Sequence, residues 1–137
     1  KNPRFNAKAS IKAKWSYQTT DIVTGYDEPI SKTQEEMLQT MTKLSELLEK
    51  NQIKLSLAVY PWPQQLQYDN RNSKHVKMWK NFCEGKCHKF LNFFPHFFNE
   101  KDEKSFLEVY KKYYFWNDVH FNAEGNRVIA QKLLKEF

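Results

Sequence analysis

Two short runs of this sequence read as buried β-strands, and they limit the folds open to the chain. The first, residues 53–60 (IKLSLAVY), alternates apolar and polar positions and must end at Pro61 and Pro63, because proline cannot donate a hydrogen bond to a neighbouring strand. The second, residues 88–95 (HKFLNFFP), is almost wholly apolar, which is typical of a parallel strand covered on both faces. Two parallel strands make a poor sheet alone, so we expect the complete sheet to contain further strands.

Helical periodicity surrounds these runs. Four helices are predicted, at residues 31–50, 73–84 and 100–113 and in a C-terminal segment with Asn122 as its N-cap. The first opens with an S-x-x-Q capping box at Ser31, and its apolar stripe predicts one buried face. The residues of that stripe are Leu38, Met41, Leu44 and Leu48.

The order of these elements predicts an α/β layer architecture with right-handed crossovers. Residues 10–17 (SIKAKWSY) alternate as a half-buried strand or an extended arm would. We therefore divide the chain into an N-terminal arm or edge strand over residues 1–30 and an α/β domain, incomplete in its sheet, over residues 31–137.

Glycine content and charge exclude several function classes. Glycine occurs three times in 137 residues, so no glycine-rich phosphate loop is present and no nucleotide cofactor is expected. The net charge of +6 favours anionic partners, but lysine and arginine are mixed with acidic residues along the whole chain. Nucleic-acid binding normally clusters basic residues on one face, so we expect no nucleic-acid partner. No apolar run approaches the roughly 18 residues of a transmembrane helix, so no membrane span is expected.

The two cysteines, Cys83 and Cys87, flank a turn that contains Gly85. A disulfide between them would close a very short loop and would imply an oxidising compartment, such as a bacterial periplasm or another extracytoplasmic space. Two free thiols at a helix end are the alternative. A metal site of these cysteines with His88 lacks a fourth ligand, so no metal is expected.

The segment NDVHFNAEGNRVIAQKLL, residues 117–134, sets Asp118 and His120 two positions apart before a helix. A histidine general base needs a carboxylate on one ring nitrogen and an open path from the other to a nucleophile. Side chains two positions apart in a loop can turn toward each other, so Asp118 can accept from His120 Nδ1. The alternative is helix capping, since Asp, Asn and His are common before helices.

This segment resembles the last conserved block of the SGNH (GDSL-type) hydrolase superfamily, D-x-H-x-N-x-x-G, through Asp118, His120, Asn122 and Gly125. The strand that runs into VYPWPQQ (residues 59–65) is similar to the strand and loop before the active-site rim in the branch that acts on acylated cell-surface polysaccharides. The resemblance covers the second half of such a three-layer, flavodoxin-like domain.

The resemblance implies a role for each matching residue. Asp118 would orient and charge-stabilise the base, and His120 would activate a serine and later protonate the leaving alcohol. Tyr60 and Trp62 would lie near the pocket and bind substrate, because open α/β sheets bind ligands at the carboxyl ends of their strands. For Trp62, a loop anchor packed on a helix is the alternative.

The family's nucleophile segment, a strand followed by a G-D-S turn, is missing from this sequence, as are the Gly and Asn of the oxyanion hole. None of the serines sits in a glycine-flanked strand-to-helix turn (Ser10, Ser16, Ser31, Ser45, Ser56, Ser73 and Ser105). The chain is then expected to be the C-terminal catalytic part of a serine esterase or O-acyltransferase that acts on acylated carbohydrate, with an acylated polysaccharide or a small ester as substrate. Its serine would lie in a missing N-terminal part of the same protein. The alternative is a non-catalytic carbohydrate-binding relative, in which tryptophans would stack on sugars.

Overall fold

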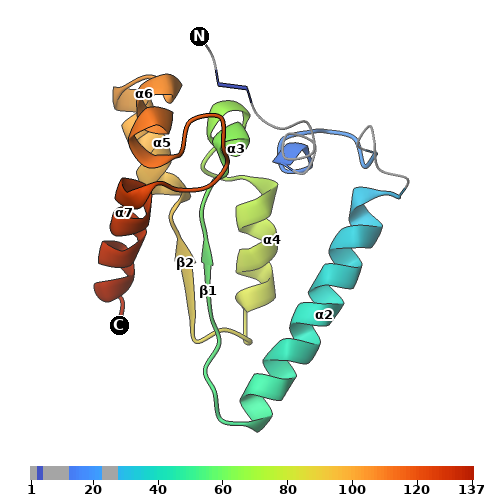
Figure 1. Cartoon of the computed structure of the whole chain (residues 1–137). Helices are drawn as coiled ribbons and strands as arrows, with labels where there is room; N and C mark the ends of the chain where they lie inside the picture. Colours follow the sequence, from blue (N-terminus) through green and yellow to red (C-terminus); the bar gives the residue numbers. More distant parts are fainter. Residues whose placement is uncertain (1–2, 5–12, 23–27) are drawn as a thin grey trace.

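The computed structural model describes residues 3–4, 13–22 and 28–137 of the chain. At its centre, strands β1 (Ser56–Val59) and β2 (Lys89–Asn92) pair in parallel, with Ser56 opposite Lys89 and Val59 opposite Asn92 (Figure 1). Six labelled helices accompany them: α2 (Ile30–Lys50), α3 (Pro63–Tyr68), α4 (Lys74–Cys83), α5 (Phe94–Glu103), α6 (Phe106–Tyr113) and α7 (Ala123–Leu134). The predicted α/β class with a parallel sheet is confirmed at this level. No helix in the described ranges is long and apolar enough to cross a membrane.

Strand β1 has β2 on one edge only. The carbonyl oxygens of Leu55 and Val59 accept hydrogen bonds from His88 and Phe93, at the two ends of the β2 segment. Because backbone groups alternate in direction along a strand, those of Ser56 and Ala58 point to the opposite edge. In the described part of the chain the sheet contains β1 and β2 alone, so this edge has no strand beside it.

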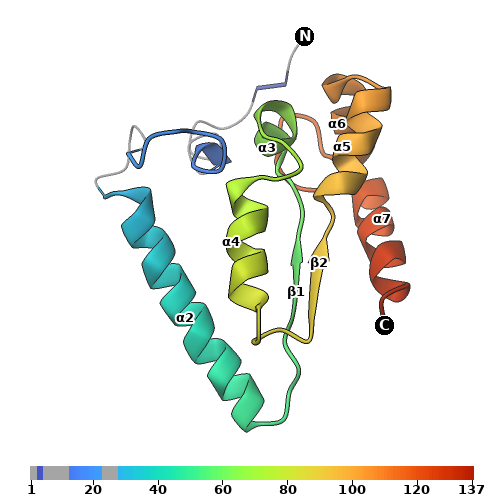
Figure 2. The same ribbon diagram turned by 180° about the vertical axis from the view of Figure 1, so that it is seen from behind.

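The core lies between the sheet and the helices that follow it. Figure 2 shows α5, α6 and α7 gathered on the β2 side, while α4 packs along β1. Aromatic rings dominate this core, which holds Phe94, Phe97, Tyr110, Tyr113 and Tyr114 at 2% exposure or less. Burial of rings of this size, each removing on the order of 150–250 Å² from water, makes this part of the chain the main source of stability.

One predicted helix and one predicted strand need correction. The segment predicted as one helix over residues 100–113 is two, because α5 ends at Glu103 and α6 begins at Phe106. Ser105 separates them as the N-cap of α6, accepting from Glu108 N–H while Glu108 accepts from Ser105 N–H at 2.9 Å. The predicted strand at 88–95 is also shorter, since Phe94 and Pro95 start α5.

The described part of the N-terminal arm contains one helical turn. Within the predicted strand at residues 10–17, residues 13–17 form a helical turn, with Tyr17 N–H donating to Lys14 O, while residues 10–12 lie outside the described ranges. Side-chain contacts hold this turn in place. Trp15 stacks on His75, and Gln65 Nε2 donates to Ser16 Oγ at 3.1 Å.

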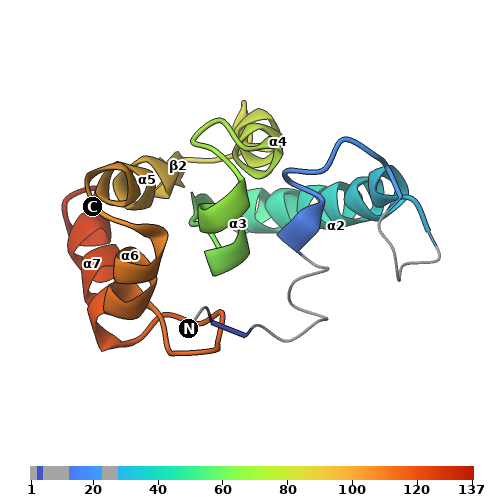
Figure 3. The ribbon, with the colours of Figure 1, turned by 90° about the horizontal axis from the view of Figure 1, so that it is seen from above.

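Helix α2 has the predicted extent but neither the predicted cap nor the predicted burial. Its N-cap position is Pro29, and the hydroxyl of Ser31 donates to Asp21 at 2.6 Å, so the Ser31–Gln34 capping box is wrong. No residue of α2 is buried, and Leu47 is 57% exposed. Figure 3 shows α2 reaching away from the other elements. The apolar stripe exists in the sequence, but no described element covers it.

Candidate active site

The segment between α6 and α7 forms a short hairpin. Tyr114 and Phe121 make an antiparallel bridge, and Phe115 N–H donates to His120 O at 3.1 Å. The hydroxyl of the buried Tyr110 lies 2.7 Å from Phe115 O and 2.9 Å from Asp118 O, and it accepts from Asp118 N–H at 3.0 Å. The segment expected to be an irregular loop is therefore held in one shape by a side chain from α6.

This hairpin brings Asp118 and His120 together. His120 Nδ1 lies 2.7 Å from Asp118 Oδ1, and the side chain of His120 is 79% exposed. A carboxylate only accepts, so the proton of this bond sits on Nδ1, and in a neutral ring Nε2 is then free to accept from a hydroxyl. The hydrogen bond from His120, assisted by Val119 N–H, lowers the pKa of Asp118 below its usual value. The lowered pKa keeps Asp118 ionised near neutral pH.

Asn122 and Gly125 build the other end of the hairpin. The Asn122 side chain accepts from Gly125 N–H at 3.0 Å as the N-cap of α7 and donates to Lys112 O at 3.0 Å. A Cβ on Gly125 would lie 2.3 Å from Tyr113 O, so only glycine fits beside that carbonyl. Both residues act on the backbone: Asn122 ties α7 to the end of α6, and Gly125 allows the close approach.

Tyr60 lies beside this hairpin. It directly follows β1, and its ring centre is 5.0 Å from that of Phe121, the neighbour of His120. Tyr60 is 42% exposed, which leaves part of its ring open to a ligand. The fold thus brings Tyr60 beside Phe121, the residue after His120 in the chain, and a substrate contact for Tyr60 stays a prediction.

Trp62 has a structural position as well. It is partly buried at the N-cap of α3, where its backbone N–H donates to Gln65 Oε1 at 2.9 Å. Helix α3 was not predicted; its signals are Pro63 at the first helical position and Gln65 two residues later, which closes back on the Trp62 backbone. A substrate contact for Trp62 stays a prediction.

Two residues that support the site were missed from the sequence. Tyr110 lies in the segment predicted as a helix over residues 100–113, and its hydroxyl organises the hairpin. Tyr114 is fully enclosed, and its hydroxyl donates to Pro61 O at 2.7 Å, joining the end of β1 to the start of the hairpin. The spacing of these tyrosines in the sequence predicts only that their rings are buried. The hydrogen-bond partners of their hydroxyl groups depend on the tertiary structure.

The described serine hydroxyls that have a hydrogen-bond partner have it elsewhere. Ser16 is buried against Ala13 O and Gln65, Ser45 donates to Thr42 O, and Ser73 and Ser105 cap helices. Within the described ranges no serine is hydrogen-bonded to His120; Ser10 lies outside them. Asp118 and His120 thus form a hydrogen-bonded pair to which no described serine donates.

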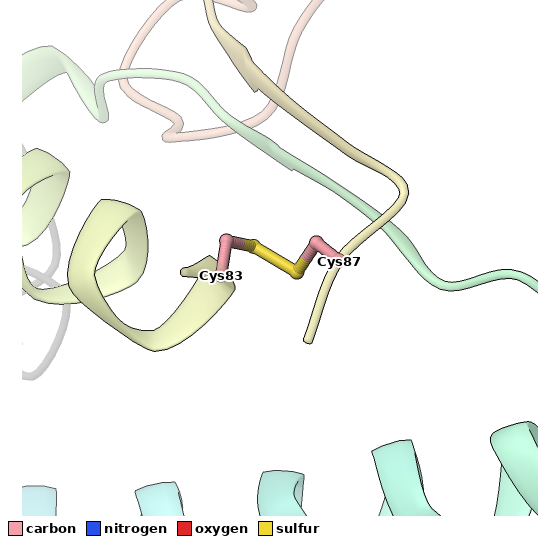
Figure 4. Close-up of a disulfide and its surroundings, with 2 residues drawn as sticks. All are labelled: Cys83 and Cys87. Atoms are coloured by element: carbon pink, nitrogen blue, oxygen red, sulfur yellow. A yellow bond between two sulfur atoms is a disulfide. The ribbon is translucent and has the colours of Figure 1, made fainter. Parts of the chain in front are cut away.

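Cys83 and Cys87 form a disulfide with an S–S distance of 2.05 Å (Figure 4). It joins the last residue of α4 to the segment leading into β2 across a four-residue separation, with Gly85 at a positive φ in the turn. Of the alternatives left open by the sequence, the structure has the disulfide. It fixes the turn at the end of the sheet opposite the Asp118–His120 hairpin.

Comparisons of the chain with protein-family models, with curated proteins and with solved structures found no significant match.

Proposed function

We propose that this chain supplies the Asp and His of a Ser-His-Asp triad in a serine esterase or O-acyltransferase of the SGNH type. One observation carries the proposal: the 2.7 Å contact between His120 Nδ1 and Asp118 Oδ1, with the imidazole otherwise open to solvent. The D-x-H-x-N-x-x-G resemblance supports it, since Asn122 and Gly125 have local structural reasons to accompany the pair.

In this mechanism His120 Nε2 takes the proton of a serine hydroxyl while the serine oxygen attacks the ester carbonyl. Asp118 holds the ring and stabilises the imidazolium that forms. His120 then returns the proton to the departing alcohol, leaving an acyl-serine. Attack by water or by an acceptor hydroxyl, with its proton taken by the same nitrogen, releases the acyl group and restores the serine.

The serine is proposed to come from polypeptide outside the described residues. Two features of the fold support this: the free edge of β1 and the uncovered stripe of α2. Parallel sheets are normally covered on both faces and rarely consist of two strands. A further strand would pair with the free edge of β1 and would give the apolar stripe of α2 a sheet to pack against.

The proposed substrate is an acylated carbohydrate, with Tyr60 and Trp62 on its binding side. Tyr60 supports this part, because its half-exposed ring lies beside Phe121. We further propose a periplasmic or other extracytoplasmic location, supported by the Cys83–Cys87 disulfide, since such bonds persist in oxidising compartments.

The test is ester hydrolysis by the longest reading frame that contains these residues, with p-nitrophenyl acetate and an acetylated oligosaccharide as substrates. His120→Ala should lower kcat/KM at least about 10³-fold, and Asp118→Asn about 10²- to 10⁴-fold. His88→Ala is the matched control, because His88 is an exposed histidine in the turn after the disulfide; it should leave the rate unchanged.

The 137-residue chain alone should not turn over either substrate. Turnover by this chain that is lost in His120→Ala would show that the nucleophile lies within it. A longer protein whose activity is unaffected by His120→Ala would contradict the proposed role of the pair. Carbohydrate binding without hydrolysis, insensitive to Asp118→Asn, would favour the non-catalytic relative.

A further inference from the structure

The hairpin that holds Asp118 and His120 also displays two aromatic side chains. Phe115 is 56% exposed and Trp116 is 46% exposed, although the two residues before them, Tyr113 and Tyr114, are buried. The two adjacent exposed rings, on the hairpin that also carries Asp118 and His120, form a small apolar patch that a ligand could cover. We name Phe115 and Trp116 the hairpin aromatics.

The backbone under these rings is fixed. Tyr110 contacts the carbonyl oxygen of Phe115, and the N–H of Phe115 donates to His120 O. The Trp116 ring packs against the Tyr110 ring with centroids 5.7 Å apart. Both aromatic residues are thus positioned by the same tyrosine that positions Asp118, and a ligand loses little binding free energy in ordering them.

A positive charge accompanies Trp116. Lys111 Nζ lies 5.7 Å from the Trp116 ring centre, and within the described ranges Lys111 forms no salt bridge. Its neighbours on α6 are already engaged: Glu108 accepts from Ser105 N–H and Oγ–H at 2.9 and 2.6 Å, and Lys112 is paired with Glu100. The ammonium group of Lys111 is therefore open to an anionic group brought to the ring.

The area of the hairpin aromatics fits a small ligand. Two rings about half exposed offer on the order of 200 Å², whereas a stable protein interface needs about 800 Å² from each partner. A sugar ring has the matching chemistry: one face of C–H groups to lie on an aromatic ring, hydroxyls at its edge for water, and in a uronic acid a carboxylate for a lysine.

We propose that the hairpin aromatics and Lys111 form a subsite for a uronate-containing saccharide. The subsite deepens the proposed function, on which it rests for its place beside an ester-reactive pair, because it would hold a sugar of the acylated chain next to the residue that is deacylated. The sugar ring lies on Phe115 or Trp116, and its carboxylate meets Lys111.

Binding is measured on the 137-residue chain by amide chemical shifts in a ¹H–¹⁵N NMR titration with oligogalacturonate and, separately, with neutral maltohexaose. Oligogalacturonate should shift the amides of residues 115–120. Trp116→Ala or Phe115→Ala should weaken its binding at least about tenfold. Lys111→Gln should weaken oligogalacturonate binding at least about threefold without changing the response to maltohexaose.

Tyr68→Ala is the matched control, because Tyr68 is a 62% exposed aromatic on α3; it should bind as the wild type does. No shift in residues 115–120 at high millimolar oligogalacturonate would overturn the subsite, as would equal binding by Trp116→Ala. A dimer in the wild type that Trp116→Ala converts to a monomer would also overturn it, since the rings would then contact a second copy of the chain.

The two proposals fail separately. The titration involves no ester chemistry, so saccharide binding with no ester turnover by the longer protein would leave the subsite standing and remove the triad. Turnover of p-nitrophenyl acetate that requires His120, without saccharide binding at the hairpin, would do the reverse.

Discussion

Helices α2 and α6 are both amphipathic, but only α6 has its apolar side covered. In α6, Val109, Tyr110 and Tyr113 are buried against α5, α7 and the hairpin, whereas the 21 residues of α2 include none that is buried. The comparison separates a well-packed region, which contains Asp118 and His120, from a helix that has no buried residue. The hairpin that brings Asp118 and His120 together is therefore held by α6 and its neighbours and not by α2.

The sharpest test of this difference compares two truncations to alanine, one in the aromatic core and one on α2. Phe97→Ala removes a fully buried ring that contacts Tyr113, Tyr114 and Phe121, so the free energy of unfolding should fall by about 3–5 kcal/mol. Leu47→Ala on α2 should change it by less than about 0.5 kcal/mol. Urea unfolding followed by circular dichroism measures both. Equal losses would mean that α2 is packed and that the contrast is wrong.

The well-packed region also contains a buried histidine, His75, whose protonation is disfavoured in the folded state. Burial lowers the pKa of His75 from its usual 6.5 to about 4, with Asp69 acting weakly in the opposite direction. Gln65 Nε2 lies 3.2 Å from His75 Nδ1 and requires that nitrogen to accept, so the folded state holds the neutral ring. The unfolded chain binds the proton more readily between these two pKa values.

The contribution of His75 to stability is therefore complete above about pH 6.5 and is lost as the pH falls toward 4, by up to about 3 kcal/mol. Urea midpoints measured from pH 7 to pH 4 should decline accordingly. The His75→Gln variant lacks the titrating ring and should show a flatter profile. If both proteins lose stability in parallel, His75 does not titrate as its burial implies.

A smaller effect on the free energy of unfolding is expected at two glycines. Gly125 is closely packed, whereas Gly85 faces open space. Gly125→Ala should cost about 1–3 kcal/mol, because the new Cβ meets Tyr113 O and the Phe121 side chain. It should also shift the amide resonances of residues 114–121. Gly85→Ala faces open space and carries only the left-handed φ of +73°, so it should cost about 1 kcal/mol and leave the hairpin resonances unchanged. An unperturbed hairpin in Gly125→Ala would refute the close-approach role.

Strong local signals made part of the fold predictable. The two strands, α4 and α7 follow from apolar runs, Pro61 and Pro63, and the caps Ser73 and Asn122, all of which act through neighbours in sequence. The break between α5 and α6 was missed, although residues 99–105 (NEKDEKS) contain no apolar residue and Ser105 and Glu108 form a capping box. The burial of α2 was predicted wrongly, since an apolar stripe shows what a helix can bury and not whether a partner is there.

The candidate site was predictable to a similar degree. The spacing of Asp118 and His120 permits their contact, and the position of Tyr60 after a strand places it at the sheet's carboxyl edge. The supporting hydroxyl of Tyr110 was not predictable. Its partners are backbone groups of the hairpin, and their positions depend on tertiary packing that no local spacing encodes.

The most direct test of the account is the tautomer of His120, read from the ring nitrogen shifts in a long-range ¹H–¹⁵N NMR spectrum at a pH where the ring is neutral. Because Asp118 accepts from Nδ1, we expect the wild-type ring to carry its proton on Nδ1, with Nε2 unprotonated. In Asp118→Ala the proton should move toward Nε2, the form that free histidine prefers. A wild-type ring protonated on Nε2, or the same tautomer in both proteins, would contradict the claim that Asp118 orients His120 as a base.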